Sequence, residues 1–259
     1  MRVRTHATHL LMAVALCAIA ATHSLADWNS TIAASNPLNW YRLDETGPIA
    51  IDYGSEGLDG TYGTGVHAPT QGVPGRVGTA ASFDGDQDNI LLHGGDIAGD
   101  WTAEFIVMRT GTRTSAELLR GEPFASPSSH LKLEQYPNTG QVGYTQSFVA
   151  DHVFSPGYTT PLDEFVHLVY VKTATEMKLY ADGVLKGTNA STISLPRYQF
   201  GDAMAESPLA VVDEIVVYDR ALSPGEIAGH FNAIPEPSTL ILAASGLAAA
   251  AIWALCKRR

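Results

Sequence analysis

The 259-residue sequence is poor in cysteine. It has two, Cys17 and Cys256, which lie near opposite ends of the chain. The region between them can therefore form neither a disulfide framework nor a thiol nucleophile. Its loops must be held by other interactions, which directs attention to its acidic residues.

Basic residues are also scarce. The chain has 16 Lys and Arg against 27 Asp and Glu, which gives a net charge of −11. Five of the basic residues lie at the two ends, at positions 2, 4, 257, 258 and 259, so residues 27–236 carry −16. A segment with this charge repels phosphate backbones, and we expect no nucleic-acid partner.

Sequence motifs of common catalytic centres are missing. The chain has no His-x-x-x-His or His-Glu-x-x-His pattern, no Gly-x-Ser-x-Gly elbow and no phosphate-binding loop with its lysine. His167 falls in an apolar segment, where we expect it to hydrogen-bond a neighbour. The sequence favours a protein that is not an enzyme.

The N-terminus has the pattern of a secretory signal peptide. Two arginines precede an apolar stretch over residues 10–21, and Ser24-Leu25-Ala26 is a small-x-small cleavage pattern. The stretch is shorter than the roughly 20 apolar residues of a membrane-spanning helix. We predict a signal peptide over residues 1–26 and an exported protein.

Short runs rich in β-branched and aromatic residues dominate the middle of the chain, with Gly, Pro, Asp and Asn between them. They predict strands at residues 101–109, 164–172, 176–181, 184–190 and 209–219. Asp182-Gly183 predicts a type I′ hairpin turn.

Two further segments complete the expected secondary structure. One short helix is expected from Pro224 to Phe231, because Ser223 and Glu226 can form a capping box. From Asp44 to Gly99 the chain is dense in Gly, Asp, Thr and Pro, which predicts ordered loops more than strands.

The order of these motifs resembles the LamG-like, concanavalin A-like domain of secreted bacterial proteins. The matching segments are WYRLDET (40–46), AIDYGSEGLDGTY (50–62), GVPGRVGTAASFDG (72–85), WTAEF (101–105), EFVHLVYV (164–171), KLYADG (178–183) and VDEIVVYDRALSPGEI (212–227). The resemblance implies an all-β fold, a two-sheet antiparallel jelly-roll sandwich, over residues 27–233. Phe165 and Ile106 stand where the family usually has Trp, and residues 110–160 match little, so the register there stays open.

Two acidic residues are the expected metal ligands. Asp213 and Glu214 are adjacent carboxylates in an apolar strand, which are costly to bury unless paired, hydrogen-bonded or bound to metal. In the resembled family, the Asp of this pair and that of the early Ala-x-Asp motif, here Asp52, often approach a structural calcium ion, which prefers oxygen ligands. The alternative is that Asp213 accepts backbone N–H bonds in a turn and Glu214 is solvated.

The alternative function for such a fold is a glycan-active enzyme, a glycoside hydrolase or lyase. Retaining hydrolases that resemble laminarinases place two carboxylates on one face of a strand, about 5 Å apart. Strict alternation in DEIVVYD instead places Asp213 with Ile215 and Val217, and Glu214 on the other face. The acid and nucleophile pair is missing, and we predict no catalytic residue.

The C-terminus, residues 234–259, resembles the PEP-CTERM sorting signal. Pro235, Glu236 and Pro237 precede an apolar segment at 239–255, and three basic residues follow it. The apolar segment is at the lower limit of length for a transmembrane helix, and its basic end should stay cytoplasmic. The resemblance implies a precursor anchored in the inner membrane, an exosortase-type processing enzyme as partner, and delivery to the cell surface or extracellular matrix.

Together these features describe an exported, lectin-like module that binds a polysaccharide or packs against a matrix protein. The sequence leaves glycan binding and a structural role in the matrix open, and it predicts no particular ligand-binding residue.

Overall fold

The computed structural model describes residues 27–122, 128–137, 139–202 and 204–235. The predicted signal peptide and the apolar segment at 239–255 lie outside these residues. Of the predicted sorting motif, Pro235 is described, while Glu236 and Pro237 are not. Within the described residues, no helix combines the length and apolarity that crossing a membrane requires.

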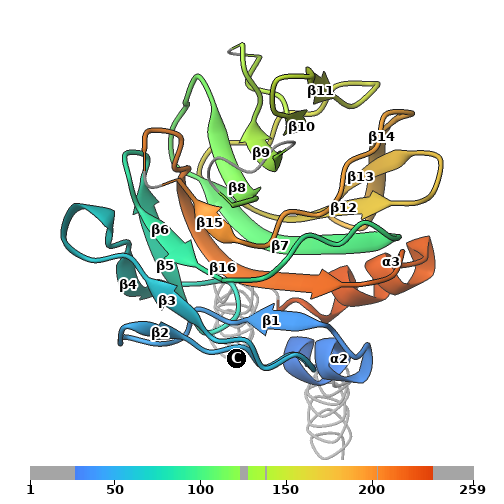
Figure 1. Ribbon diagram of the computed structural model, residues 1–259. Helices are drawn as coiled ribbons and strands as arrows, with labels where there is room; N and C mark the ends of the chain where they lie inside the picture. The colour runs from blue at the N-terminus through green and yellow to red at the C-terminus, as the bar shows by residue number, and fades with distance from the viewer. Residues whose placement is uncertain (1–26, 123–127, 138, 203, 236–259) are drawn as a thin grey trace, which may run out of the picture.

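Two antiparallel sheets pack face to face and form the body of the protein (Figure 1). The first has the order β14 (Val184–Asn189), β13 (Met177–Ala181), β12 (Phe165–Lys172), β7 (Trp101–Arg109), β16 (Leu209–Tyr218), β5 (Thr79–Asp84) and β4 (Thr70–Pro74), and β1 (Asn39–Tyr41) also pairs with β16. The second has the order β11 (Ala150–Val153), β10 (Gly143–Gln146), β9 (Ser129–Glu134), β8 (Ala116–Arg120), β15 (Gln199–Gly201), β6 (Asn89–Leu91), β3 (Gly60–Tyr62) and β2 (Ile49–Ala50). The predicted all-β jelly-roll sandwich is confirmed.

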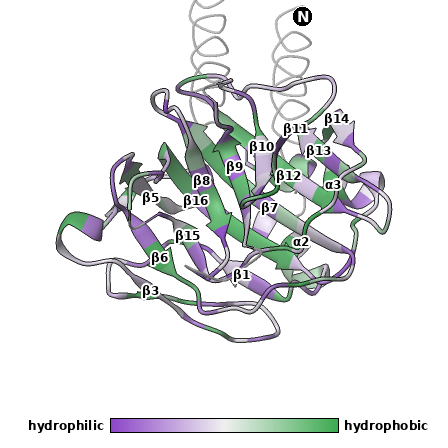
Figure 2. Cartoon of the chain, turned by 45° about the horizontal axis from the view of Figure 1, so that its top comes forward, coloured by the Kyte–Doolittle hydropathy of each residue, from purple (hydrophilic) through white to green (hydrophobic). Residues whose placement is uncertain are grey.

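The main hydrophobic core lies between the two sheets. Phe200 of the second sheet packs against Phe83 and Phe105 of the first, with ring centroids 5.1 and 6.2 Å apart. Figure 2 shows apolar residues concentrated along the strands in the middle of the molecule. Burying these rings removes a large apolar area from water, the main source of stability in such a sandwich.

Two short helices cover the outer face of the first sheet, α2 (Trp28–Ala34) and α3 (Pro224–Ala233). They enclose a second hydrophobic cluster, to which Trp28, Trp40 and Ile227 belong. The predicted capping box is present, because Ser223 Oγ accepts the Glu226 N–H while the Glu226 side chain accepts the Ser223 N–H.

The strongly patterned segments form strands close to the predicted bounds, as β7, β12, β13, β14 and β16 show. The predicted turn also forms, since Asp182 and Gly183 have φ values of 53° and 73°. Both residues thus adopt the left-handed backbone that a type I′ turn needs.

The prediction of loops between Asp44 and Gly99 is wrong in part. Five strands, β2 to β6, lie in this segment, together with a 3-10 turn at Gly65–His67. They are two to six residues long. β5 and β6 pair with the distant strands β16 and β15, whereas β2, β3 and β4 pair within the segment. Strands this short, set among turn-forming residues, are not revealed by local composition. Helix α2 was not predicted either.

Candidate functional site

Asp52, the first predicted metal ligand, accepts four hydrogen bonds. Its Oδ1 accepts from the backbone N–H of Trp40 at 2.7 Å and of Gly54 at 2.8 Å. Its Oδ2 accepts from Asn39 Nδ2 and the backbone N–H of Leu58, both at 2.8 Å. A carboxylate offers about four lone-pair positions, so these donors use all of them. Asp52 therefore ties β1 to the loop that leads into β3.

Asp213, the second predicted ligand, lies at a β-bulge, because the pairing of β16 with β7 shifts between Val212 and Glu214. Ile215 and Val217 keep their places in the core between the sheets. The extra residue in the strand takes Asp213 off the face that alternation gives it. The predicted grouping of Asp213 with Ile215 and Val217 is therefore wrong.

The turn between β4 and β5 holds the Asp213 carboxylate. Its Oδ2 accepts the backbone N–H of Arg76 at 2.5 Å and of Val77 at 2.6 Å, as the alternative to calcium predicted. Its Oδ1 has no hydrogen-bond partner among the described residues. Burial raises the pKa of Asp213 to about 7, although the two N–H bonds act in the other direction.

Glu214 is fully buried, so the expectation that it is solvated is wrong. Its Oε2 accepts a hydrogen bond from Trp40 Nε1 at 2.6 Å, and its Oε1 has no partner within the described part of the chain. Burial raises the pKa of Glu214 well above the usual value, and the neighbouring Asp213 raises it further. Burial therefore favours the protonated form of both carboxyls.

The hydrogen-bond donors of Asp52 and Asp213 differ, and the two carboxylates share none of them. Among the residues with described positions, no three Asp, Glu, His or Cys side chains form a metal-binding group. Of the two predicted ligands, Asp213 keeps one oxygen, Oδ1, without a hydrogen-bond partner among the described residues, and a carboxylate oxygen is a ligand that calcium accepts. Calcium binding stays a prediction.

Another buried carboxylate, Glu104 of β7, lies beneath the two helices. Its Oε2 is 3.0 Å from His167 Nε2 and its Oε1 is 2.9 Å from His230 Nδ1. His230 Nε2 in turn lies 2.7 Å from Ser35 Oγ, at the end of α2. Burial alone would raise the pKa of Glu104, but the hydrogen bonds with His167 and His230 lower it to about 2. This cluster ties α2 and α3 to the first sheet, and it confirms the hydrogen-bonding role predicted for His167.

The outer face of the second sheet carries a group of charged side chains. Leu131 and Leu133 of β9 belong to the core between the sheets, so His130 and Lys132 face outward. Lys132 Nζ lies 2.9 Å from Glu117 Oε1 of β8, and His130 Nδ1 lies 2.7 Å from the same oxygen.

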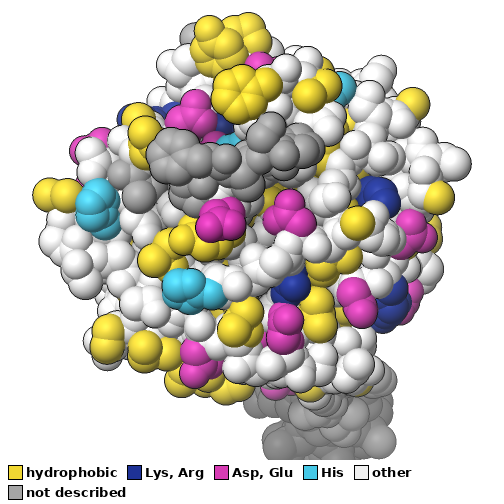
Figure 3. Space-filling model, viewed as in Figure 1, with side chains coloured by type: hydrophobic (Ala, Val, Ile, Leu, Met, Phe, Trp, Pro, Cys, Tyr) yellow, Lys and Arg dark blue, Asp and Glu magenta, His cyan; other side chains and the backbone are white. Residues whose placement is uncertain are grey.

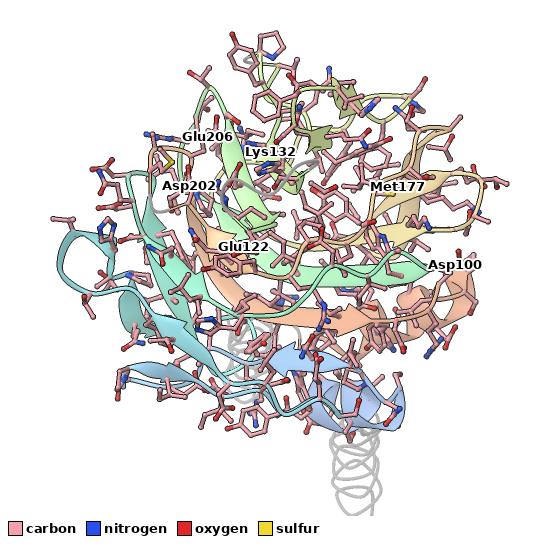
Figure 4. The ribbon with its side chains drawn as sticks, in the orientation of Figure 1. Asp100, Glu122, Lys132, Met177, Asp202 and Glu206 are labelled. Atoms are coloured by element: carbon pink, nitrogen blue, oxygen red, sulfur yellow. The ribbon has the colours of Figure 1, made fainter. Side chains whose placement is uncertain are left out.

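The loop after β15 extends this group. Asp202 pairs with Arg120 of β8, and Glu206 pairs with Lys132. Figure 4 shows Lys132, Asp202 and Glu206 gathered around β8 and β9. We call the whole set the polar strip: Glu117, Arg120, His130, Lys132, Asp202 and Glu206.

The polar strip is a network of ion pairs, and its buried carboxylate is not suited to acid catalysis. Burial alone would raise the pKa of Glu117, but the hydrogen bond from His130 and the charge of Lys132 lower it to about 2. The general acid of a glycosidase must hold a proton near the working pH. Glu117 does not meet this requirement.

Cavities open at both ends of the polar strip. Two cavities, of about 370 and 220 Å³, lie at one end of the strip, where β8 and β10 end and β9 begins. Asp96 lines both. We call these two cavities the Asp96 cleft; Glu122, Ser128 and Tyr198 line the larger one, and Gln146 and Lys172 line the smaller one. A cavity of about 420 Å³ lies at the other end, between residues 112–115, Tyr136 and Glu206.

The Asp96 cleft is open and acidic. Burial raises the pKa of Asp96, while the charges of Arg197 and His130 act in the other direction. The residues around the cavities are largely polar, and on the face in Figure 3 acidic side chains lie among uncharged ones. Such a cleft presents hydrogen-bond acceptors to a ligand that carries hydroxyl donors.

Sequence reasoning missed the polar strip and the Asp96 cleft. Most of the residues concerned lie between 93 and 146, and residues 110–160 match the family pattern poorly. One signal was present, because SHLKLE (129–134) alternates polar and apolar residues, which is typical of a strand with one polar face. The cleft itself is assembled from loops far apart in sequence.

Comparison with known families agrees with this architecture. The family model of the concanavalin A-like lectin/glucanases superfamily matches residues 84–228, and the PEP-CTERM protein-sorting motif matches residues 233–259. The chain belongs to the concanavalin A-like lectin/glucanases superfamily. Its sorting motif indicates an exported protein that is sorted to the cell envelope and processed by an exosortase.

Solved structures with similar folds include enzymes and binding domains. Domain 4 of AbnA, a GH43 extracellular arabinanase from Geobacillus stearothermophilus, in complex with arabinotriose, has a TM-score of 0.58 and 18% identity over 75% of this chain and 98% of that domain. A Trypanosoma rangeli sialidase has a TM-score of 0.56 and 16% identity over 76% of this chain and 32% of its own. The binding domain of Paraclostridial Mosquitocidal Protein 1 has a TM-score of 0.56 and 13% identity over 76% of this chain and 52% of its own.

At these identities the likeness shows the fold alone. The chain spans about a third of the length of the sialidases that it matches. No curated protein sequence matches the chain.

Proposed function

We propose that this protein is a non-catalytic, lectin-like module. As a precursor it is held in the inner membrane by its C-terminal segment. An exosortase-type enzyme then processes it, and it is delivered to the cell surface or the extracellular polysaccharide matrix. There it binds glycan.

The observation that carries this proposal is the Asp96 cleft. It is an open, polar depression at one end of the second sheet, with the Asp96 and Glu122 carboxylates among its lining residues. Such carboxylates accept hydrogen bonds from sugar hydroxyl groups. The similar fold of an arabinanase domain in complex with arabinotriose, of which the chain covers 98%, supports a sugar as ligand.

Glycan hydrolysis is the less favoured function. The buried carboxylate of the polar strip, Glu117, is ionised because its pKa is lowered to about 2. The pKa values of Asp213 and Glu214 are raised, but both residues are buried on the first sheet, away from the polar face of the second. A purely structural role, packing against a matrix protein, is the other alternative.

The proposal is tested by binding of the purified full-length chain to a panel of immobilised polysaccharides. We expect binding that Asp96→Asn weakens at least tenfold, because a charge-assisted hydrogen bond is worth about 1.5–3 kcal/mol. Asp163→Asn is the matched control. Asp163 is exposed, lies between β11 and β12, and has a φ of 59° that Asn also tolerates.

Three results would count against the proposal. Equal effects of the two substitutions would remove the Asp96 cleft from the binding site. Lack of binding to every polysaccharide would favour the structural role. Release of new reducing ends from a polysaccharide would identify an enzyme.

A further inference from the structure

The β10–β11 turn presents an aromatic side chain to solvent. Phe148 is 98% exposed, and the next residue, Val149, is 66% exposed. Phe148 also has a φ of 65°, in the left-handed region that bulky side chains rarely adopt. Both features are unfavourable in isolation, and strained residues of this kind occur at functional sites.

The turn is firmly held from both sides. The backbone N–H of Ser147 donates to Ser128 O, and that of Val149 donates to Gln146 O, both at 2.9 Å. The Ser147 side chain also contacts the polar strip, with its Oγ 2.7 Å from His130 Nε2. The backbone that carries the ring is therefore positioned in advance, which lowers the entropy cost of binding a ligand.

Phe148 sits beside the Asp96 cleft. Gln146, two residues before it, lines the smaller cavity, and Ser128, which is bonded to its neighbour Ser147, lines the larger one. The chain thus places Phe148 two residues from Gln146 of the cleft, at the same end of the second sheet. Its exposed ring offers an apolar surface on this side of a cleft that carries hydrogen-bond acceptors.

The charges of the cleft favour a neutral sugar over an acidic one. Asp96 and Glu122 contribute negative charge, and the Lys172 ammonium donates hydrogen bonds to Ala98 O and Gly99 O, each at 2.8 Å. Residues 27–236 also carry a net charge of −16. A polysaccharide of uronic acids would be repelled, whereas a neutral sugar would not.

We propose that Phe148 is a stacking platform for one pyranose ring of a neutral glycan, whose adjoining sugars donate hydroxyl hydrogen bonds to Asp96 and Glu122 in the cleft. A pyranose has an apolar face of C–H groups that packs on an aromatic ring, as other apolar groups do. This inference rests on the proposed glycan-binding function and names its ligand class and a further binding residue.

The test compares three variants of the full-length chain with the wild type, using dextran and laminarin as neutral probes and alginate as an acidic probe. We expect Phe148→Ala to weaken binding of the neutral probes by roughly tenfold, which is the effect of losing an aromatic contact of about 1.5 kcal/mol. Phe148→Trp retains binding because it keeps a ring. Val66→Ala, at a 71% exposed residue between β3 and β4, leaves binding unchanged. Alginate does not bind at low salt.

The outcomes separate this inference from the proposed function. One outcome is that the neutral probes bind, that Asp96→Asn weakens their binding and that Phe148→Ala does not. In that case the stacking role of Phe148 is wrong, while the glycan site at the Asp96 cleft stands. If alginate binds as tightly as dextran, the assignment to neutral glycans is wrong. If the wild type binds neither the neutral probes nor alginate, the proposed function fails as well. Thermal melting of Phe148→Ala should match the wild type, since the side chain is 98% exposed.

Discussion

Glu104 and Glu214 are buried carboxylates on paired strands of the same sheet, and they respond to burial in opposite ways. Glu104 of β7 lies opposite Val216, and Glu214 of β16 lies opposite Ile106. Both side chains are 0% exposed. Nevertheless, the pKa of Glu104 falls to about 2, whereas that of Glu214 rises well above its usual value.

The partners of the two carboxylates explain the difference. Glu104 lies between the imidazoles of His167 and His230, which donate to its ionised form. Glu214 has one indole N–H from Trp40, and its chain neighbour Asp213 is another acid. Burial penalises ionisation at both positions, so the number and charge of the donors decide which carboxylate stays ionised.

The largest expected effect is that of Glu104→Gln. The amide cannot accept from both imidazoles as the carboxylate does, and buried polar groups then lose their partners. We expect a loss of roughly 2–4 kcal/mol in the free energy of unfolding. Urea unfolding followed by fluorescence would measure it.

The pH dependence of Glu104 follows from its lowered pKa. The group contributes stability above the unfolded value of 4.5, and this contribution is lost as the pH falls toward 2. The wild type should lose stability over that range more steeply than Glu104→Gln. If Glu104→Gln lowers the free energy of unfolding by less than about 1 kcal/mol at pH 7, the cluster of Glu104, His167 and His230 contributes little to stability.

An intermediate effect is expected for Asp213→Asn. Because the pKa of Asp213 is raised from 3.8 to about 7, the folded protein binds a proton that the unfolded chain releases. The wild type should therefore lose stability as the pH rises from about 4 to about 7, by up to about 1 kcal/mol per pH unit, and then level off. Asp213→Asn removes the titrating carboxyl and should make the free energy of unfolding less dependent on pH. Urea unfolding at several pH values would measure this.

The same variant tests the predicted calcium site. Calcium would bind the ionised form of the Asp213–Glu214 pair, so added calcium should raise the melting temperature of the wild type at pH 8 and not that of Asp213→Asn. If chelator and calcium leave the wild-type melting temperature unchanged, the calcium hypothesis should be abandoned.

The smallest effect is expected for Glu214→Gln. This is the same Glu→Gln change as at Glu104, made on the neighbouring strand. Because burial and the neighbouring Asp213 raise the pKa of Glu214 well above its usual value, we expect a neutral amide of similar shape to replace the carboxyl with little change. We expect less than about 1 kcal/mol in the free energy of unfolding. A loss as large as that of Glu104→Gln would mean that Glu214 is ionised and bound to a cation.

The sequence predicted the strongly patterned elements well. Strands β7, β12 and β16 are long and apolar, and α3 has a capping box, so local signals suffice there. The short strands β2 to β6 were missed because they are only two to six residues long and lie among turn-forming residues, and β5 and β6 also pair with the distant strands β16 and β15. The bulge at Asp213 was missed because alternation alone does not reveal an inserted residue.

The candidate site was predicted less completely. Asp52 and Asp213 were predicted as calcium ligands, and the structure supplies backbone N–H donors to both. The Asp96 cleft and Phe148 were not identified, because a cleft made from loops far apart in sequence leaves no local pattern.

The sequence by itself determined the class of fold, the family and the sorting motif, since each is encoded in short segments with a fixed order or period. The tertiary structure decided which acids are ionised and where a ligand can enter. Glu104 and His230 are 126 residues apart in the chain yet 2.9 Å apart in space. Hydrogen bonds and electrostatic forces act over distances in space, so folding must bring such partners together before their pKa values and the shape of the cleft are defined.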